Sequence, residues 1–100
     1  MKYEHPGVGL EMTLDNLNIS QKQFAEIVGK SPTEVNHIIN GRRAITPDWA
    51  FRICAVFGGK PSVWLSLQAK YDEQEYKNSL KYPQFLEIQK KAKKLIPSFA

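Results

Sequence analysis

Two closely spaced helix start signals constrain the fold of this chain more than any other feature of its sequence. Ser20 is followed by Gln23 three residues later, and the same spacing separates Ser31 from Glu34. At this spacing a serine hydroxyl and a glutamine or glutamate side chain satisfy free backbone N–H groups at a helix start. Gly29 lies between the two signals, and glycine adopts the left-handed conformation that ends a helix without steric cost. The sequence therefore predicts two short helices joined by a tight turn.

Similar signals divide the rest of the chain into further helices, and strand signals are weak. A first helix is expected over residues 8–18, after the turn sequence HPG, and Gly41 ends the third helix. Thr46 with Pro47 starts a fourth helix, and Pro61 opens a fifth. The apolar residues expected on these helices and on the second one are Leu10, Leu14, Leu17, Phe24, Ala25, Ile27, Val28, Ala50, Ile53, Cys54, Phe57, Val63, Trp64 and Leu67.

The chain changes character beyond Asp72. The stretch EQEYKNSLKYP is polar, and we expect a linker or a frayed helix there. A last amphipathic helix is predicted from Gln84 to the stop signal Pro97, with lysines 90, 91, 93 and 94 off its apolar stripe. We therefore expect an all-α fold, with a five-helix domain over residues 1–72 and a linker with a helical extension over residues 73–100. The apolar stripe of the extension is Phe85, Ile88, Ala92 and Leu95.

Composition excludes several classes of protein. With 100 residues, 42% of them apolar, the chain has the size and core content of one globular domain. No apolar run approaches the roughly 20 residues of a membrane-spanning helix, and the first ten residues lack the apolar stretch of a secretory signal. We therefore expect a cytoplasmic protein. Cys54 is the only cysteine, so neither an internal disulfide nor a multi-cysteine zinc site can form.

The inventory of reactive residues argues against catalysis. The sequence has no cluster of cysteine and histidine, no glycine-rich phosphate loop and no evident nucleophile beside a base. We expect neither an enzyme nor a bound cofactor or metal, and we interpret His5 as a turn residue. The net charge of +4 is compatible with a polyanionic partner but does not require one.

The two central helices have the spacing of a helix-turn-helix. Counting from Gln21, Ala25 at the fifth position lets the helices cross closely, and Gly29 at the ninth makes the turn. Val35 at the fifteenth position and Ile38 at the eighteenth anchor the second helix on the first. In this motif the second helix enters the major groove of DNA. The combination indicates DNA binding, although each element alone is common.

The outward face of the second helix of the pair carries uncharged polar side chains. With about 100° between successive residues, Thr33, His37 and Asn40 turn outward when the apolar residues face the core. Asn36 lies on the flank. Asparagine can bond bidentately to adenine, and threonine and histidine can reach base edges or phosphates. A polar face also keeps any helix in solution, but lysine and glutamate would serve that purpose equally well. We predict that these four residues contact bases.

Further residues are expected at the phosphates. Helix N-termini in this motif approach the DNA backbone and donate N–H groups to it, and Gln21 and Lys22 occupy such a position. The run GRR has no neighbouring carboxylate, which favours phosphate contact over surface solvation. Glu34 is assigned to helix capping, because phosphates repel a carboxylate. The predicted phosphate-contacting residues are Gln21, Lys22, Lys30, Ser31, Arg42 and Arg43.

A resemblance to the lambda-repressor-type helix-turn-helix (XRE) family is carried by LNISQKQFAEIVGKSPTEVNHIINGRRAITPDWAFRICAVFG. The flanks HPG and WLSLQAKYD resemble its HigA-like antitoxin branch, so that the resemblance covers about residues 5–72. It implies a dimeric repressor of its own operon that neutralises a HigB-like toxin, an mRNA-cleaving endoribonuclease. It gives Gln21 a backbone-contact position and Thr33, Asn36 and His37 base-facing positions. Pro32 departs from repressors that place a base-contacting glutamine there.

Two other functions stay open. The chain fits a stand-alone or phage-type repressor without a toxin, and it also fits a helical module that sequesters a partner protein without binding DNA. Trp64 and the tail helix would serve the second of these. A small ribonuclease-like reading frame beside the gene would favour the antitoxin. For a DNA-binding protein of this kind we expect a symmetric dimer, with two copies of the third helix in successive major grooves of a palindromic operator.

Overall fold

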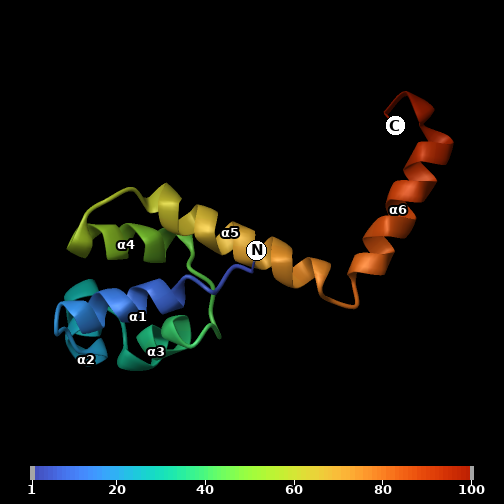
Figure 1. The fold of residues 1–100 in the computed structure, drawn as a ribbon. Helices are drawn as coiled ribbons and strands as arrows, with labels where there is room; N and C mark the ends of the chain where they lie inside the picture. Colours follow the sequence, from blue (N-terminus) through green and yellow to red (C-terminus); the bar gives the residue numbers. More distant parts are fainter. Residues whose placement is uncertain (1, 100) are drawn as a thin grey trace.

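Six α-helices and one short 3-10 helix follow one another in the computed structural model, which describes residues 2–99 (Figure 1). No strand forms within those residues, so the predicted all-α fold is confirmed. Met1 and Ala100, the two ends of the predicted domain division, lie outside the described residues. The elements are α1 (Gly7–Asn16), α2 (Gln21–Val28), α3 (Pro32–Ile39), α4 (Pro47–Phe57), α5 (Pro61–Lys77), α6 (Tyr82–Leu95) and η1 (Pro97–Phe99).

Local capping explains where the central helices begin. Ser20 and Ser31 both form complete capping boxes, and the Thr46 hydroxyl accepts from the backbone N–H of Trp49 at 3.3 Å. Gly29 ends α2 with a φ of 74°, in the left-handed region that favours glycine. The predicted starts of these three helices are therefore confirmed. By contrast, α5 begins at Pro61, as predicted, and its N-cap residue Lys60 makes no side-chain capping bond.

The core lies among α1 to α4 and is closed on one side by α5. In Figure 1, α4 and α5 lie above α1, and α2 and α3 lie below it. Residues that are partly buried against the core are Ile19, Val56, Phe57, Trp64 and Leu65. The buried apolar residues are Leu10, Leu14, Phe24, Ala25, Val28, Val35, Ile38, Ile39, Ile45, Trp49, Ala50 and Ile53.

Several predicted apolar positions are solvent-exposed instead. Leu17 follows the last turn of α1, and Ile27 lies on the outer side of α2, where they are 55% and 62% exposed. Val63 and Leu67 on α5 are also exposed. Cys54 is only half-buried. In each case an apolar residue one or three positions away, namely Leu14, Val28, Ile53 or Trp64, is buried in the core or packed against it. The buried stripe of each helix is therefore narrower than its run of apolar residues.

The polar stretch after Asp72 is more ordered than the sequence predicts. Helix α5 continues through it to Lys77, and only residues 78–81 form a turn before α6. Gln68, which is buried on α5, accepts from the backbone N–H of Ile45 at 2.8 Å and donates to Asp72 at 2.9 Å. These bonds tie the middle of α5 to the domain. The division at residue 72 therefore falls inside a continuous helix, and it stays a prediction.

Helix α6 stands apart from the other five helices at the far end of α5 (Figure 1). None of its residues is buried, and Ile88 and Leu95 are 67% and 71% exposed. The molecule is consequently elongated, with extents of 56 × 25 × 24 Å. The predicted amphipathic extension is confirmed as a helix, but its apolar stripe contacts none of the core. Within residues 2–99 no helix is both long and apolar enough to cross a membrane.

Candidate nucleic-acid interface

Helix α3 has one buried face and one exposed polar face. Its apolar side chains anchor it in the core, since none of them is more than 5% exposed. Thr33, Asn36 and Asn40 are exposed on the opposite side, and His37 is half-exposed. The structure thus brings the four predicted base-contacting residues together at one surface. The anchoring side chains are Val35, Ile38 and Ile39.

Two capping boxes fix the residues at which α2 and α3 begin. In the first box the N–H of Gln23 lies 3.0 Å from the Ser20 hydroxyl, and the Gln23 side chain accepts from the Ser20 N–H at 2.9 Å. In the second box the corresponding distances between Ser31 and Glu34 are both 3.1 Å. The first turn of a helix leaves further backbone N–H groups without an intrahelical partner, and an anion can accept hydrogen bonds from them.

A chain of side-chain amides links the start of α2 to the end of α3. Asn36 donates to the side-chain oxygen of Gln21 at 3.3 Å, and Asn40 donates to the side-chain oxygen of Asn36 at 3.0 Å. The Asn36 side chain is therefore held from both directions. A side chain that is ordered before binding loses less conformational entropy when it contacts a base edge. The hydrogen bonds of Asn36 therefore lower the entropy cost of binding at the polar face of α3.

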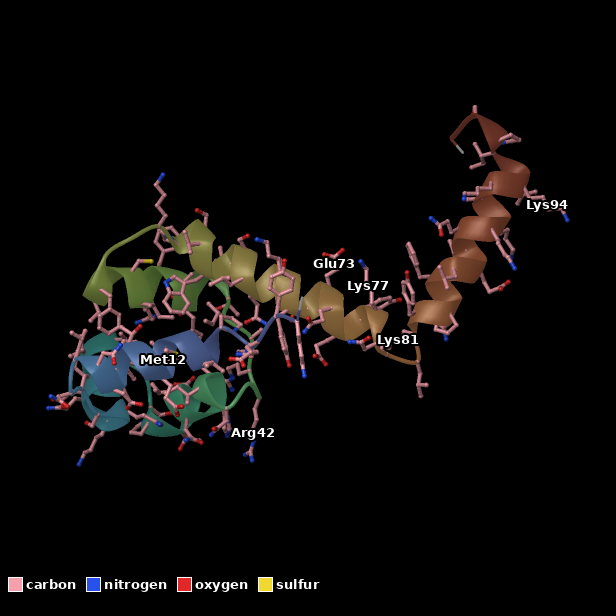
Figure 2. The ribbon with its side chains drawn as sticks, in the orientation of Figure 1. Met12, Arg42, Glu73, Lys77, Lys81 and Lys94 are labelled. Carbon is pink, nitrogen blue, oxygen red and sulfur yellow. The ribbon has the colours of Figure 1, made fainter. Side chains whose placement is uncertain are left out.

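The predicted phosphate-contacting cations differ in their surroundings. Lys22 and Arg42 are exposed, and neither forms an ion pair within residues 2–99. In Figure 2, Arg42 projects away from the edge of the domain near the end of α3. Lys30 lies 3.5 Å from the carboxylate of Asp48 and 5.9 Å from the ring centroid of Trp49. The charge of Lys30 is thus already engaged by two neighbours.

Arg43 also has a carboxylate partner. The sequence suggested that the two arginines of GRR stand without a neighbouring carboxylate, and for Arg43 this expectation is wrong. Its Nη1 donates to Oε1 of Glu34 at 3.2 Å. Glu34 precedes Arg43 by nine residues, and the fold of the chain after α3 brings the two together. The residues adjacent to GRR in the sequence give no sign of this pair.

Glu34 is ionised at neutral pH. The backbone N–H of Ser31 is the main cause that holds the pKa of Glu34 below its usual value, and the positive charges of Lys30 and Arg43 act in the same direction. The expectation that Glu34 caps α3 is confirmed. The structure adds that this capping carboxylate carries a full negative charge beside Arg43.

The N-terminal segment supports α3 from behind, a role that sequence reasoning missed. His5 is buried, and its Nδ1 accepts from the backbone N–H of Gly7 at 2.9 Å. Its ring lies edge-on to Tyr71, with 5.1 Å between the ring centroids, and against Gly41. Burial lowers the pKa of His5 below its usual value, although Asp72 and a backbone hydrogen bond to Arg43 oppose the shift. His5 therefore joins the chain start to the end of α3 and to α5.

Among residues 2–99, no three histidine, cysteine, aspartate or glutamate side chains gather in a group that could hold a metal ion. The polar surface of α3 consists of amides, a hydroxyl and an imidazole, with cations nearby.

Comparison with known sequences gives matches over the same helices. A helix-turn-helix family model matches residues 10–65. The uncharacterized HTH-type transcriptional regulator YddM of Escherichia coli is 33% identical over 66 residues, which are 66% of this chain and 70% of YddM. The chain spans between 60% and 70% of the length of the first curated relatives that it matches.

Solved structures extend the similarity to most of the chain. An addiction module antidote protein of the HigA family from Coxiella burnetii is 35% identical, with a TM-score of 0.78, and the match covers 87% of this chain and 94% of that one. The Pseudomonas aeruginosa antitoxin HigA, solved with the higBA promoter, is 27% identical with a TM-score of 0.77. That match covers 84% of this chain and 91% of the antitoxin.

Proposed function

Since this chain belongs to the helix-turn-helix family and is a DNA-binding regulator related to HigA antitoxins, we propose that it represses its own operon as a dimer and neutralises a HigB-like toxin. Its relatives are transcriptional regulators and antidote proteins, so the expectation that the chain is not an enzyme is confirmed. A repressor of this kind acts where the operon is transcribed, and the cytoplasm is its expected location.

The observation that carries this proposal is the exposed face of α3. Thr33, Asn36 and Asn40 are exposed there, with His37 beside them, on a helix whose other face is buried. Side chains of this length and polarity form hydrogen bonds with base edges in the major groove. We therefore propose that these four residues determine which operator is bound.

Phosphate contacts complete the proposed interface. Gln21 opens α2 and Ser31 caps α3, so the free N–H groups at both helix starts can donate to phosphate oxygens. Lys22 and Arg42 supply positive charge that no carboxylate within residues 2–99 neutralises. Two more predicted contacts, by Lys30 and Arg43, require that each leave its present ion pair first.

The geometry of operator binding favours a dimer. One α3 contacts only a few base pairs, and a symmetric dimer doubles that number on a palindromic site. We propose that the two copies of α3 enter the major groove about one helical turn of DNA apart. Bound dimer would then block transcription.

The toxin partner is supported by the relatives and by the tail. The similar protein from Pseudomonas aeruginosa is an antitoxin, HigA, and it was solved with the higBA promoter. Helix α6 leaves a row of apolar side chains uncovered, which is a surface for another protein. The alternative of a repressor without a toxin is favoured by the match to YddM, whose name describes only a transcriptional regulator.

Co-expression with the adjacent reading frame tests the proposal. The neighbouring protein should co-purify with this chain, and the complex or the free chain should shift the DNA upstream of the two genes. A shift without co-purification would favour the stand-alone repressor. Co-purification without a shift, on any upstream fragment, would favour the module that only sequesters a partner. Either result would overturn one half of the proposal, and the absence of both co-purification and a shift would overturn the whole of it.

A further inference from the structure

The two capping boxes of this protein make the same hydrogen bonds with different side chains. In the box of α2 the reciprocal residue is the neutral Gln23, and in the box of α3 it is the charged Glu34. The four bonds of the two boxes have lengths of 2.9 to 3.1 Å. A neutral side chain can therefore make the capping bonds of α3. Glu34 is bonded to Ser31 and Arg43, two of the proposed phosphate contacts.

The Glu34 carboxylate is divided between two partners. Its Oε2 accepts from the backbone N–H of Ser31 at 3.1 Å and lies 3.4 Å from the Ser31 hydroxyl. Its Oε1 accepts from Arg43 at 3.2 Å. Because Ser31 fixes the carboxylate at the start of α3, the negative charge stays in place whichever way the Arg43 side chain turns.

Arg42 and Arg43 are neighbours with different surroundings. The side chain of Arg42 forms no ion pair within residues 2–99 and projects into solvent (Figure 2). Arg43 is held by Glu34, and both partners remain partly exposed, at 46% and 33% of their side-chain surface. An exposed pair of this kind is weak and exchanges readily. Removing the carboxylate charge would therefore release Arg43 for another anion.

We propose that Glu34 restrains the sequence-independent affinity of this protein for DNA by occupying Arg43 in the place of a phosphate. The inference rests on the proposed DNA-binding function of α3 and adds a residue that limits it. Each phosphate neutralised by a basic side chain steepens the dependence of log K on log salt by about 0.9. The ion pair with Glu34 therefore removes about one phosphate contact per protomer. The affinity of the protein for DNA that lacks an operator is lowered as a result.

The main test compares Glu34→Gln with the wild-type chain on a random-sequence duplex. Gln23 already performs the same capping role in α2, so the variant should keep its fold, which circular dichroism will check. We expect Glu34→Gln to bind random DNA about three- to tenfold more tightly near 0.1 M salt and to steepen the salt dependence by about 0.9 per protomer. Glu26→Gln is the matched control, because it makes the same change in net charge at an exposed position of α2. Glu26 forms no ion pair within residues 2–99.

Arg43→Ala separates the proposal from simple charge repulsion. In the wild-type background it should leave random-sequence affinity and the salt slope nearly unchanged, whereas Arg42→Ala should reduce the slope by about one. In the Glu34→Gln background, Arg43→Ala should abolish the gain. A gain that survives Arg43→Ala, or one that Glu26→Gln matches, would overturn the proposal.

The outcomes also separate this inference from the proposed function. If the wild-type chain fails to prefer its upstream DNA, the proposed function fails, while the random-sequence comparison can still show the Glu34 effect. If the wild type prefers its upstream DNA and Glu34→Gln changes nothing on the random duplex, only the present inference fails.

Discussion

At the scale of single residues, the surface of α3 combines two kinds of side chain with separate tasks. The amides of Gln21, Asn36 and Asn40 are joined by hydrogen bonds, and the neighbouring charges are either engaged or directed to solvent. Uncharged tips favour contacts that depend on the base, whereas cations favour contacts with any phosphate. Substitutions in the two groups should therefore have different effects on DNA binding.

His37→Ala should weaken operator binding by about 1–3 kcal/mol and relax the preference at one base pair, because a single base-contacting side chain is lost. Binding to random DNA should change little. The measurement is a titration of the variant on the operator, on single-base variants of it and on a random duplex. Arg42→Ala is the contrasting variant, since it should weaken binding to all these sequences alike. An equal loss on operator and random DNA for His37→Ala would count against base contact.

The stability of the domain should depend on the protonation of His5. Its neutral Nδ1 accepts from Gly7, and burial lowers its pKa in the folded state. The unfolded chain therefore binds the proton more readily, with a pKa of about 6.5. The stability that the neutral ring contributes is complete above that pH and is lost as the pH falls through the lowered pKa of the folded state.

His5→Asn tests this dependence, because the asparagine oxygen can replace Nδ1 as the acceptor without titrating. The free energy of unfolding, measured in urea between pH 7 and pH 5, should fall for the wild type and stay nearly level for the variant. At pH 7 we expect the variant to be less stable, since the buried contact of the ring with Tyr71 is lost. Parallel losses in both proteins between pH 7 and pH 5 would assign the dependence to other groups.

At the scale of elements, the helices that carry the interface are short. Helices α2 and α3 have eight residues each, a length at which an isolated helix is unstable in water. Capping boxes and the core contacts of their apolar faces stabilise them instead. The start of α1 contributes as well, because Gly7 lies directly against the backbone carbonyl of Ile38 in α3.

Gly7→Ala should destabilise the domain by about 1–3 kcal/mol, since a Cβ there would collide with the Ile38 carbonyl oxygen and force two backbones apart. Gly9→Ala is the matched control two residues along α1, where the nearest atoms to an added Cβ belong to the Trp64 ring, 3.9 Å away. That variant should be neutral or more stable by up to about 1 kcal/mol, because alanine favours the helix. Thermal unfolding of both variants measures the difference. If Gly7→Ala were as stable as Gly9→Ala, α1 and α3 would be able to move apart without a loss of stability.

At the scale of the whole molecule, the chain consists of a packed region and a projecting arm. Helix α6 has no buried residue, and the turn before it is held by local bonds, such as that of the Ser79 hydroxyl with the Tyr76 carbonyl at 2.7 Å. The Lys94 side chain lies at the end of the molecule far from Arg42 (Figure 2). The lysines of α6 are therefore placed away from the proposed DNA surface.

Removing residues 79–100 should leave the stability of the five-helix region unchanged to within about 0.5 kcal/mol, because the arm makes no contact with the core. Trp49 and Trp64 both belong to that region, so their fluorescence during urea unfolding reports on it directly. Sedimentation of both proteins at the same concentration will show whether the proposed dimer forms in each. A marked loss of stability without a change in oligomeric state would mean that α6 supports the domain.

Much of the fold could be predicted because the signals act over three or four residues. Ser20 with Gln23 and Ser31 with Glu34 make bonds that depend only on local spacing. The buried stripe of α3 follows from helical periodicity, and so does the exposure of its polar face. Leu17 and Ile27 were misplaced because periodicity does not say how wide a stripe the neighbouring helices cover.

The sequence by itself determined where helices α2 to α5 begin, that the fold is all-α, and which side chains share the outer face of α3. Only the tertiary structure decided which charges on that face are available, because the Arg43–Glu34 and Lys30–Asp48 pairs join residues that are distant in the chain. The burial of His5 depends in the same way on Tyr71, which is 66 positions further along. Caps and periodicity are properties of neighbouring residues, whereas ion pairs and burial arise only when separate helices pack together.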